Sequence, residues 1–459
     1  MSLGGTSMTL QYALVLHQQG QLDQAQKLYE EVLRNEPKNF DALHLLGVLH
    51  TKQKNLQTAK ILISKAIELH PSSALFYYNY GILQNDLKEY QAAIKSYDQA
   101  IAIQPNLASA FYNRGNSYQS LKQFDSAIVS YDQAIAIDAN HAEAYSSRGA
   151  ALKEVKQYDA AVASCKKAIF LQPNLAAAYS NLGNALLKLK LHQEALLQYE
   201  HAIKLQPNYA EAFLNRGIAF GLLKEYHLAL KSYQTVLQLN PQEAKAHFFS
   251  AGLYSTLQRN EEAISSYDAA VQINPYIFDE IDYGYGWQLH AKMLLCDWRN
   301  FHSDVEIITQ KLTQKSSNMS SMPFELVTFP STDALQQVCA ERYIQDEYFE
   351  FIPDRLIDRA AASKSISAHK KIKIAYVSSD FRLHPVGLLT AGLFEAHDRN
   401  RFDVCGVGLK PMDGTALCQR LSESFDKLID VSGMSTEKAV EAIRELEVDI
   451  AIDLNGHTN

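Results

Sequence analysis

The hydrophobic and small residues of the first 275 positions recur with a period of 34 residues. A proline closes each unit, except once where alanine stands in its place: Pro37, Pro71, Pro105, Ala139, Pro173, Pro207, Pro241 and Pro275. Glycine recurs ten residues after six of these positions: Gly47, Gly81, Gly115, Gly149, Gly183 and Gly217. Alanine recurs twenty-two residues after seven of them: Ala59, Ala93, Ala127, Ala161, Ala195, Ala229 and Ala263. Small residues repeat in this way where two helices cross closely, because a larger side chain would push the helices apart.

Each unit has the periodicity of two helices. In the unit after Pro71, apolar and small residues lie three and four positions apart over 77–82 and again over 93–100. A short polar turn separates the two segments, and a proline ends the second. A helix–turn–helix period of 34 residues is typical of tetratricopeptide repeats. We therefore expect residues 1–275 to form eight such hairpins stacked into an α-superhelix, because no single hairpin can bury its own apolar face.

Asparagine recurs in the first helix, two residues before the repeat glycine, and Ser147 interrupts the series: Asn79, Asn113, Asn181 and Asn215. An amide side chain can donate to and accept from a peptide backbone whatever the peptide's sequence. This ladder predicts that the groove of the superhelix captures extended client proteins or peptides with little sequence preference. The structural alternative is that asparagine is simply common at this place in such repeats.

The 34-residue period ends at Pro275. Residues 276–369 have a helical but irregular pattern, which Pro323, Pro330 and Pro353 break into short pieces. We interpret this segment as a connecting helical region.

The pattern changes again for residues 370–459, where four predicted strands alternate with helical segments. The strands cover 372–378, 402–408, 428–430 and 448–454, and the helices lie near 386–397, 415–424 and 435–446. Strand–helix alternation implies a parallel sheet with right-handed crossovers. The predicted fold class is thus an α-superhelix of repeats followed by a partial α/β, Rossmann-like domain.

Such a sheet binds ligands at the carboxyl ends of its strands, where the strand order reverses. If the order is 3-2-1-4, the first and fourth strands flank that point. The loop after the first strand carries Asp380, Arg382 and His384, and the loop after the fourth carries Asn455 and His457. Proline after His384 would open a helix whose positive N-terminus suits a phosphate or a developing anion. The structural alternative is that polar loops follow the strands of every such domain.

Composition narrows the classes of function. The chain has 43 basic and 51 acidic residues and a net charge of −8, which disfavours nucleic acid and anionic membranes as partners. Its five cysteines are widely spaced and form no CxxC pair, so we expect reduced thiols and no metal site. We expect a cytoplasmic protein, because no signal peptide or apolar run of membrane-spanning length is present. Phosphate-loop motifs, a dinucleotide fingerprint and a Ser–His–Asp set are also absent.

Several segments resemble the O-GlcNAc transferases in their bacterial, SPINDLY-like form. The resemblance rests on residues 373–381 (KIAYVSSDF), His384-Pro385, the CDW at 296–298, the DGT at 413–415 and the DLNGHT at 453–458. The order of parts also matches: repeats, connecting helices, then the glycosyltransferase region.

Membership would imply a GT-B fold of two Rossmann-like lobes. It would imply inverting transfer of GlcNAc from UDP-GlcNAc to Ser or Thr of proteins, without a cofactor or required metal. Asp380 and His384 match positions of the family's active site, where the histidine would act as a base or contact the donor and acceptor. The asparagine ladder matches the residues with which the family's repeats hold client backbones.

Two features depart from the family pattern. Leu383 stands where animal members carry a polar residue that helps to hold the sugar, so the identity of the sugar is open; related members transfer fucose. The second lobe, which supplies most of the nucleotide-sugar contacts, has no counterpart up to Asn459, so we expect residues 1–459 alone to be inactive. The competing hypothesis is a non-enzymatic adaptor whose repeats bind partner proteins.

Overall fold

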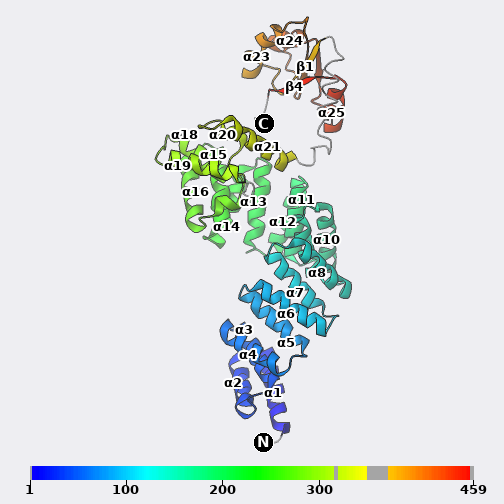
Figure 1. The fold of residues 1–459 in the computed structure, drawn as a ribbon, viewed down its shortest axis with the longest axis vertical. Coiled ribbons are helices and arrows are strands. Elements are labelled where there is room, and N and C mark those ends of the chain that lie inside the picture. Colours follow the sequence, from blue (N-terminus) through cyan, green and yellow to red (C-terminus); the bar gives the residue numbers. More distant parts are fainter. Residues whose placement is uncertain (1–2, 315–318, 349–370, 455–459) are drawn as a thin grey trace. The chain divides into compact units, whose positions relative to one another are not determined.

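The computed structural model describes residues 3–314, 319–348 and 371–454 (Figure 1). The chain divides into two compact units, Met1–Pro275 and Tyr276–Asn459, and each is described here by itself.

The first unit is an array of sixteen helices paired into eight hairpins (Figure 1). The first helices of the hairpins are α1 (Leu3–Gln18), α3 (Phe40–Lys52), α5 (Ala74–Asp86), α7 (Ala108–Ser120), α9 (Ala142–Glu154), α11 (Ala176–Lys188), α13 (Ala210–Leu222) and α15 (Ala244–Thr256). The second helices are α2 (Leu22–Asn35), α4 (Leu56–Leu69), α6 (Tyr90–Ile103), α8 (Phe124–Ile137), α10 (Tyr158–Leu171), α12 (His192–Leu205), α14 (Tyr226–Leu239) and α16 (Asn260–Ile273). The predicted superhelix of repeats is confirmed.

The repeat glycine explains how tightly each hairpin closes. In α7, a Cβ atom on Gly115 would lie 2.5 Å from Cε1 of Tyr131, a ring that is completely buried in α8. Tyrosine faces the glycine in the same way in four hairpins, in the pairs Gly81–Tyr97, Gly115–Tyr131, Gly183–Tyr199 and Gly217–Tyr233. The ring therefore rests on bare backbone, and the glycine sets the distance between the two helices.

Ion pairs link neighbouring hairpins. Nη1 of Arg114 lies 2.7 Å from Oδ1 of Asp98 in the preceding hairpin, and its Nε donates to Oγ of Ser130 within its own. The next hairpin repeats this arrangement with Arg148, Asp132 and Ser164. A partly exposed ion pair contributes little to stability. Its recurrence at one position instead fixes the register in which successive hairpins stack.

The contact between α9 and α11 is exceptional. These first helices pack directly on each other, whereas the other successive first helices of the array touch only marginally. The seventh residue after the closing position is large in most repeats: His44, Tyr78, Tyr112, Leu214 and Phe248. In α9 it is Ser146, whose small side chain lets Asn181 approach and donate to the Ser146 carbonyl oxygen at 3.2 Å. Serine recurs as Ser180, but there the partly buried Tyr209 lies beside it.

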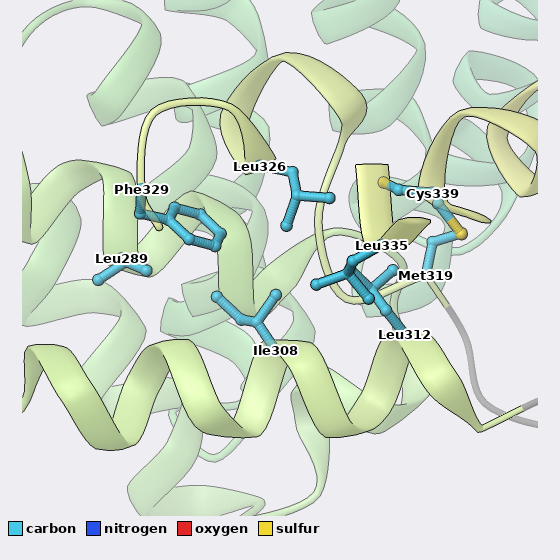
Figure 2. Close-up of a cluster of buried hydrophobic side chains, with 8 residues drawn as sticks. All are labelled: Leu289, Ile308, Leu312, Met319, Leu326, Phe329, Leu335 and Cys339. Carbon is cyan, nitrogen blue, oxygen red and sulfur yellow. The ribbon is translucent and has the colours of Figure 1, made fainter. Parts of the chain in front are cut away.

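Residues 276–348 form five helices around a core of their own. The helices are α17 (Ile277–Glu280), α18 (Gly284–Leu294), α19 (Phe301–Thr313), α20 (Pro323–Leu326) and α21 (Asp333–Tyr348). Figure 2 shows Ile308 and Leu312 pointing from α19 toward Leu326, Phe329 and Leu335. The rest of the predicted connecting region lies outside the described residues.

The last part is a four-stranded parallel sheet in the order β3-β2-β1-β4. Its strands are β1 (Ile372–Ser378), β2 (Phe402–Gly408), β3 (Lys427–Asp430) and β4 (Ile450–Asp453). Its helices are α23 (Pro385–Glu395), α24 (Ala416–Glu423) and α25 (Thr436–Arg444). The predicted strand order and the Rossmann-like class are confirmed.

Two clusters of buried side chains place the helices on opposite faces of the sheet. Phe394 of α23 and Leu421 of α24 pack with Ile374 and Val404 on one face. On the other face, Ala375 packs in a cluster that includes residues of α25. Both faces of the central strands are covered, as parallel sheets require. In the described segments, no helix has the length and apolar character needed to cross a membrane.

A matched pair of glycines in α13 tests the packing rule of the hairpins. A Cβ at Gly217 would clash with the buried ring of Tyr233, whereas at Gly221 it would meet Leu253 at an ordinary 3.8 Å. We expect Gly217→Ala to destabilise the array by about 1–3 kcal/mol through overpacking. Gly221→Ala should be neutral or stabilising by up to about 1 kcal/mol, because alanine favours helix. Thermal unfolding followed by circular dichroism measures both; equal melting temperatures would contradict the rule.

The buried carboxyl group of Glu325 should make the stability of the helical core of residues 276–348 depend on pH. Burial raises the pKa of this carboxyl to about 7, although Met322 N–H and Ser321 Oγ donate to its Oε2 atom. A raised pKa in the folded state means that protonation stabilises the fold and that this stability is lost as the pH rises through 7. The loss should reach about 3 kcal/mol between pH 4.5 and 8.

Glu325→Gln should remove most of this pH dependence. Both tryptophans of the chain, Trp287 and Trp298, belong to this region, so urea unfolding followed by tryptophan fluorescence reports on it selectively. An equal slope of stability against pH in the wild type and the variant would refute the prediction.

Candidate functional site

The carboxyl edge of the sheet brings two loops together. Residues 379–384 lead from β1 to α23, and residues 409–415 lead from β2 to α24. The strand order reverses between β1 and β4, because β2 and β3 continue on one side of β1 and β4 returns to the other. Ligands of open α/β sheets bind at such a point.

Three charged or titratable side chains of the first loop converge. Nη2 of Arg382 lies 3.6 Å from Oδ1 of Asp380, and Nδ1 of His384 lies 3.6 Å from Oδ2 of the same carboxylate. The Asp380 side chain is 11% exposed, whereas Arg382 and His384 are 38% and 41% exposed. The sequence-predicted residues Asp380 and His384 are thus neighbours, with a buried carboxylate behind two accessible donors.

His384 is also the N-cap of α23. Its Nδ1 accepts a hydrogen bond from the backbone N–H of Val386 at 3.3 Å. A neutral imidazole that accepts at Nδ1 carries its proton on Nε2. The cap therefore leaves the imidazole with an N–H to offer.

Gly387 lets the loop lie against the first turn of α23. A Cβ at this position would be 2.6 Å from the carbonyl oxygen of Arg382 and 3.0 Å from that of Asp380. The backbone of the loop thus occupies the space where any other residue would have its side chain. The absence of a side chain at Gly387 helps to fix where Asp380 and Arg382 lie.

Asp413 of the second loop is a residue that sequence reasoning did not select for the site. Its Oδ2 accepts from the backbone N–H of Leu383 at 2.7 Å, immediately before His384. The DGT at 413–415 is part of the family resemblance, but the sequence pattern does not single out Asp413 as a site residue. Within the sequence, a carboxylate that binds a backbone N–H thirty residues away leaves no pattern.

Asn455 and His457, predicted to bind substrate from the loop after the fourth strand, lie outside the described residues. Leu383, the residue before His384, carries an apolar side chain that is 66% exposed. Among the residues described, no group of three or more His, Cys, Asp or Glu side chains is placed to hold a metal ion. The described part of the edge offers hydrogen-bond donors, a helix N-terminus and one apolar side chain.

The predicted asparagine ladder is spread over α5, α7, α11 and α13. Its Nδ2 donors reach back to the preceding hairpin: Asn79 to His44 Nε2 at 2.9 Å, Asn113 to Tyr78 Oη at 3.1 Å, and Asn181 to Ser146 Oγ at 3.0 Å. The side chain of Asn215, in α13, makes no hydrogen bond to the described residues. The donors therefore serve packing between repeats in at least three places, whereas the Oδ1 acceptors make no bond to the described part of the array.

The matches to known families divide the chain close to residue 276, where the structure divides it into two compact units. Residues 295–459 match the model described as glycosyl transferase family 41. Models of the tetratricopeptide repeat match overlapping stretches from residue 16 to residue 276. The chain joins tetratricopeptide repeats to a region that matches the family 41 glycosyltransferase model. The family resemblance drawn from the sequence is confirmed.

Two curated relatives are peptide N-acetylglucosaminyltransferases. The chain is 28% identical over 178 residues to the probable UDP-N-acetylglucosamine–peptide N-acetylglucosaminyltransferase SEC of Arabidopsis thaliana, covering 37% of this chain and 18% of that protein. It is 26% identical over 174 residues to the Caenorhabditis elegans UDP-N-acetylglucosamine–peptide N-acetylglucosaminyltransferase, covering 36% of this chain and 15% of that protein. The chain thus spans less than a fifth of the length of either relative.

Solved structures resemble the helical part. The tetratricopeptide protein YrrB is 24% identical, with a TM-score of 0.33, over 40% of this chain and 95% of its own. The Cut9–Hcn1 assembly is 18% identical, with a TM-score of 0.48, over 62% of this chain and 55% of its own.

Gly387→Ala should displace the loop after β1. The added methyl group would overlap the carbonyl oxygen of Arg382, at a destabilisation of about 1–3 kcal/mol. Gly392→Ala in the same helix is the control, because a Cβ there meets nothing within 4 Å. Hydrogen exchange followed by mass spectrometry on the 379–395 segment should show faster exchange for the first variant only. Unchanged protection in Gly387→Ala would show that the loop tolerates the methyl group.

Proposed function

We propose that this chain carries the client-binding array and part of the active site of a protein O-glycosyltransferase. The reaction is transfer of GlcNAc from UDP-GlcNAc to Ser or Thr hydroxyls of proteins held in the array. The observation that carries the proposal is the convergence of Asp380, Arg382 and His384 beside the strand-order reversal, within the segment that matches family 41. The names of the two curated relatives support the donor and the acceptor class.

The geometry favours one role for His384. A histidine whose Nδ1 accepts the N–H of Val386 has an Nε2–H to donate and no free lone pair with which to remove a proton. We therefore assign His384 to hydrogen-bond donation toward the reacting groups, and not to the role of general base. The N-terminus of α23 beside it adds positive potential for the anionic diphosphate of the donor.

The buried carboxylate of Asp380 has a supporting role in this scheme. It lies 3.6 Å from Nη2 of Arg382, so it orients the guanidinium beside His384, whose Nδ1 is engaged by the Val386 N–H. Leu383 is the residue that would contact the sugar with an apolar side chain. The cytoplasm is the proposed compartment, because all five cysteines are free thiols.

The array is proposed to bind the second substrate, the acceptor protein. Asn79, Asn113 and Asn181 use their Nδ2 donors within the array, so their Oδ1 atoms are the groups left for a client. A row of acceptors suits the backbone N–H groups of an extended peptide, whatever its side chains. The client–array contact is thus proposed to be sequence-tolerant.

Two substitutions of His384 test its role in transfer. Asparagine caps helices well, so His384→Asn should keep α23 intact while removing the imidazole, whereas His384→Ala removes both. We expect kcat to fall about 10²–10³-fold in both variants, as for loss of one transition-state donor. Transfer of GlcNAc from UDP-GlcNAc to a Ser/Thr peptide is measured in two polypeptides. Residues 1–459 alone should show no transfer. The His384 variants are compared with the wild type in a polypeptide that joins residues 1–459 to a second glycosyltransferase lobe.

The outcomes of that experiment separate the two functions. Full activity in His384→Asn would show that the imidazole is dispensable. Transfer by residues 1–459 alone would refute the requirement for a second lobe. Client binding without transfer in both polypeptides would favour the adaptor.

Client capture is tested by replacing the four ladder asparagines, Asn79, Asn113, Asn181 and Asn215, with alanine. The matched control replaces four exposed asparagines that recur every 34 residues in the connections between repeats: Asn106, Asn140, Asn174 and Asn208. We expect binding of a fluorescent peptide, selected by the wild-type array from a Ser/Thr-containing library, to weaken about tenfold or more in the ladder variant only. Anisotropy is read well below both melting temperatures, because the ladder variant also loses hydrogen bonds between repeats. Equal affinity of the two variants would contradict the proposal.

A further inference from the structure

The loop after β2 reaches the candidate site through one side chain. Asp413 is exposed, but its carboxylate makes three hydrogen bonds. Oδ1 accepts from the backbone N–H of Thr415 at 3.1 Å and from its Oγ1 at 2.7 Å. Oδ2 accepts from the backbone N–H of Leu383 at 2.7 Å, in the loop after β1.

These bonds place the carboxylate between the beginnings of two helices. Leu383 immediately precedes His384, the N-cap of α23, and Thr415 is the N-cap of α24 through a bond from Cys418 N–H at 3.3 Å. Gly414, between Asp413 and Thr415, has a φ of 68°, which glycine adopts without strain. A negative charge is favourable at helix N-termini, and the Leu383 N–H holds the pKa of Asp413 below its ordinary value.

A local turn does not account for both oxygens. Asp430, the last residue of β3 at the same edge of the sheet, makes the corresponding turn with Ser432 alone: its Oδ1 accepts from Ser432 N–H at 2.9 Å, and the Ser432 side chain also bonds the carboxylate. Its other oxygen bonds no group in the described residues outside that turn. In Asp413, Oδ1 makes the bonds of the local turn, and Oδ2 accepts from the backbone of a different loop.

We propose that Asp413 is a positioning residue of the candidate site, whose carboxylate holds the loop that carries Asp380 and His384. The carboxylate accepts from the backbone N–H of Leu383, in the middle of this loop. The loop also packs against the backbone of Gly387 in α23, and it ends at His384, which caps that helix. With Asp413 in place, the imidazole keeps Nδ1 on the Val386 N–H and presents Nε2–H outward. What the imidazole then does rests on the proposed function, whereas the positioning itself does not.

The test compares Asp413→Ala with Asp430→Ala in the 459-residue protein. Hydrogen exchange at the Leu383 amide should be about tenfold faster or more in Asp413→Ala, because a bond to a charged acceptor is lost. The ¹⁵N chemical shifts of the His384 imidazole should move away from the values of an acceptor Nδ1 toward those of an averaged ring. Asp430→Ala should change neither, although it removes an equivalent turn.

A third variant separates positioning from folding. Thr415→Val removes one bond to Oδ1 and disturbs the cap of α24, but leaves the Leu383 bond in place. It should lower the stability of the sheet domain without altering the His384 spectrum. His384 shifts that respond equally to Thr415→Val and Asp413→Ala would overturn the proposal, as would an unchanged Leu383 exchange rate in Asp413→Ala.

Titration with UDP distinguishes this inference from the proposed function. UDP should perturb the His384 resonances of the wild type, and about tenfold more UDP should be needed for Asp413→Ala. Absence of any UDP effect on the wild type would count against the proposed function alone, since the exchange and chemical-shift results decide the role of Asp413 without a ligand.

Discussion

The array depends on the contact between a backbone without a side chain and a buried ring. Wherever glycine in the first helix faces tyrosine in the second, the ring fills the space that a Cβ would need, and the two helices are held at one separation. That constraint recurs in four of the eight hairpins, at Gly81, Gly115, Gly183 and Gly217, and gives these four nearly the same helix spacing. Stacking of similar hairpins then gives a superhelix, and the ion pairs of Arg114 and Arg148 each join one hairpin to the hairpin before it.

In the α/β part, a glycine also permits a close approach between two segments of backbone, here at the candidate site. Gly387 gives up its side chain so that the loop after β1 can lie on the first turn of α23. The polar groups of that loop are thereby held at the carboxyl edge of β1, between a helix N-terminus and a neighbouring loop. In the array, the absence of a side chain sets the spacing between helices, whereas at the sheet edge it sets where Asp380 and Arg382 lie.

The sequence could predict whatever repeats or alternates. The 34-residue period led to eight hairpins, and strand–helix alternation led to a sheet whose order the structure confirms. Asp380 and His384 could be placed near each other because they follow one strand closely. The bond from Leu383 to Asp413 could not be foreseen, since it joins a side chain to a backbone group that every residue possesses. The burial of Glu325 was equally hidden, because an irregular helical segment gives no period from which to read an inward face.

The junction of α9 and α11 has a consequence for how the array comes apart. In a stack of repeats, stability is close to a sum of nearest-neighbour interfaces, and unfolding proceeds from the weakest boundaries. Most boundaries of this array rest on the second helix of one hairpin against the first helix of the next, but this boundary also joins two first helices. It lies near the middle of the array, between the fifth and sixth hairpins. Fraying from either end would therefore be slowed at this boundary, so that the fifth and sixth hairpins form the last cooperative block to melt.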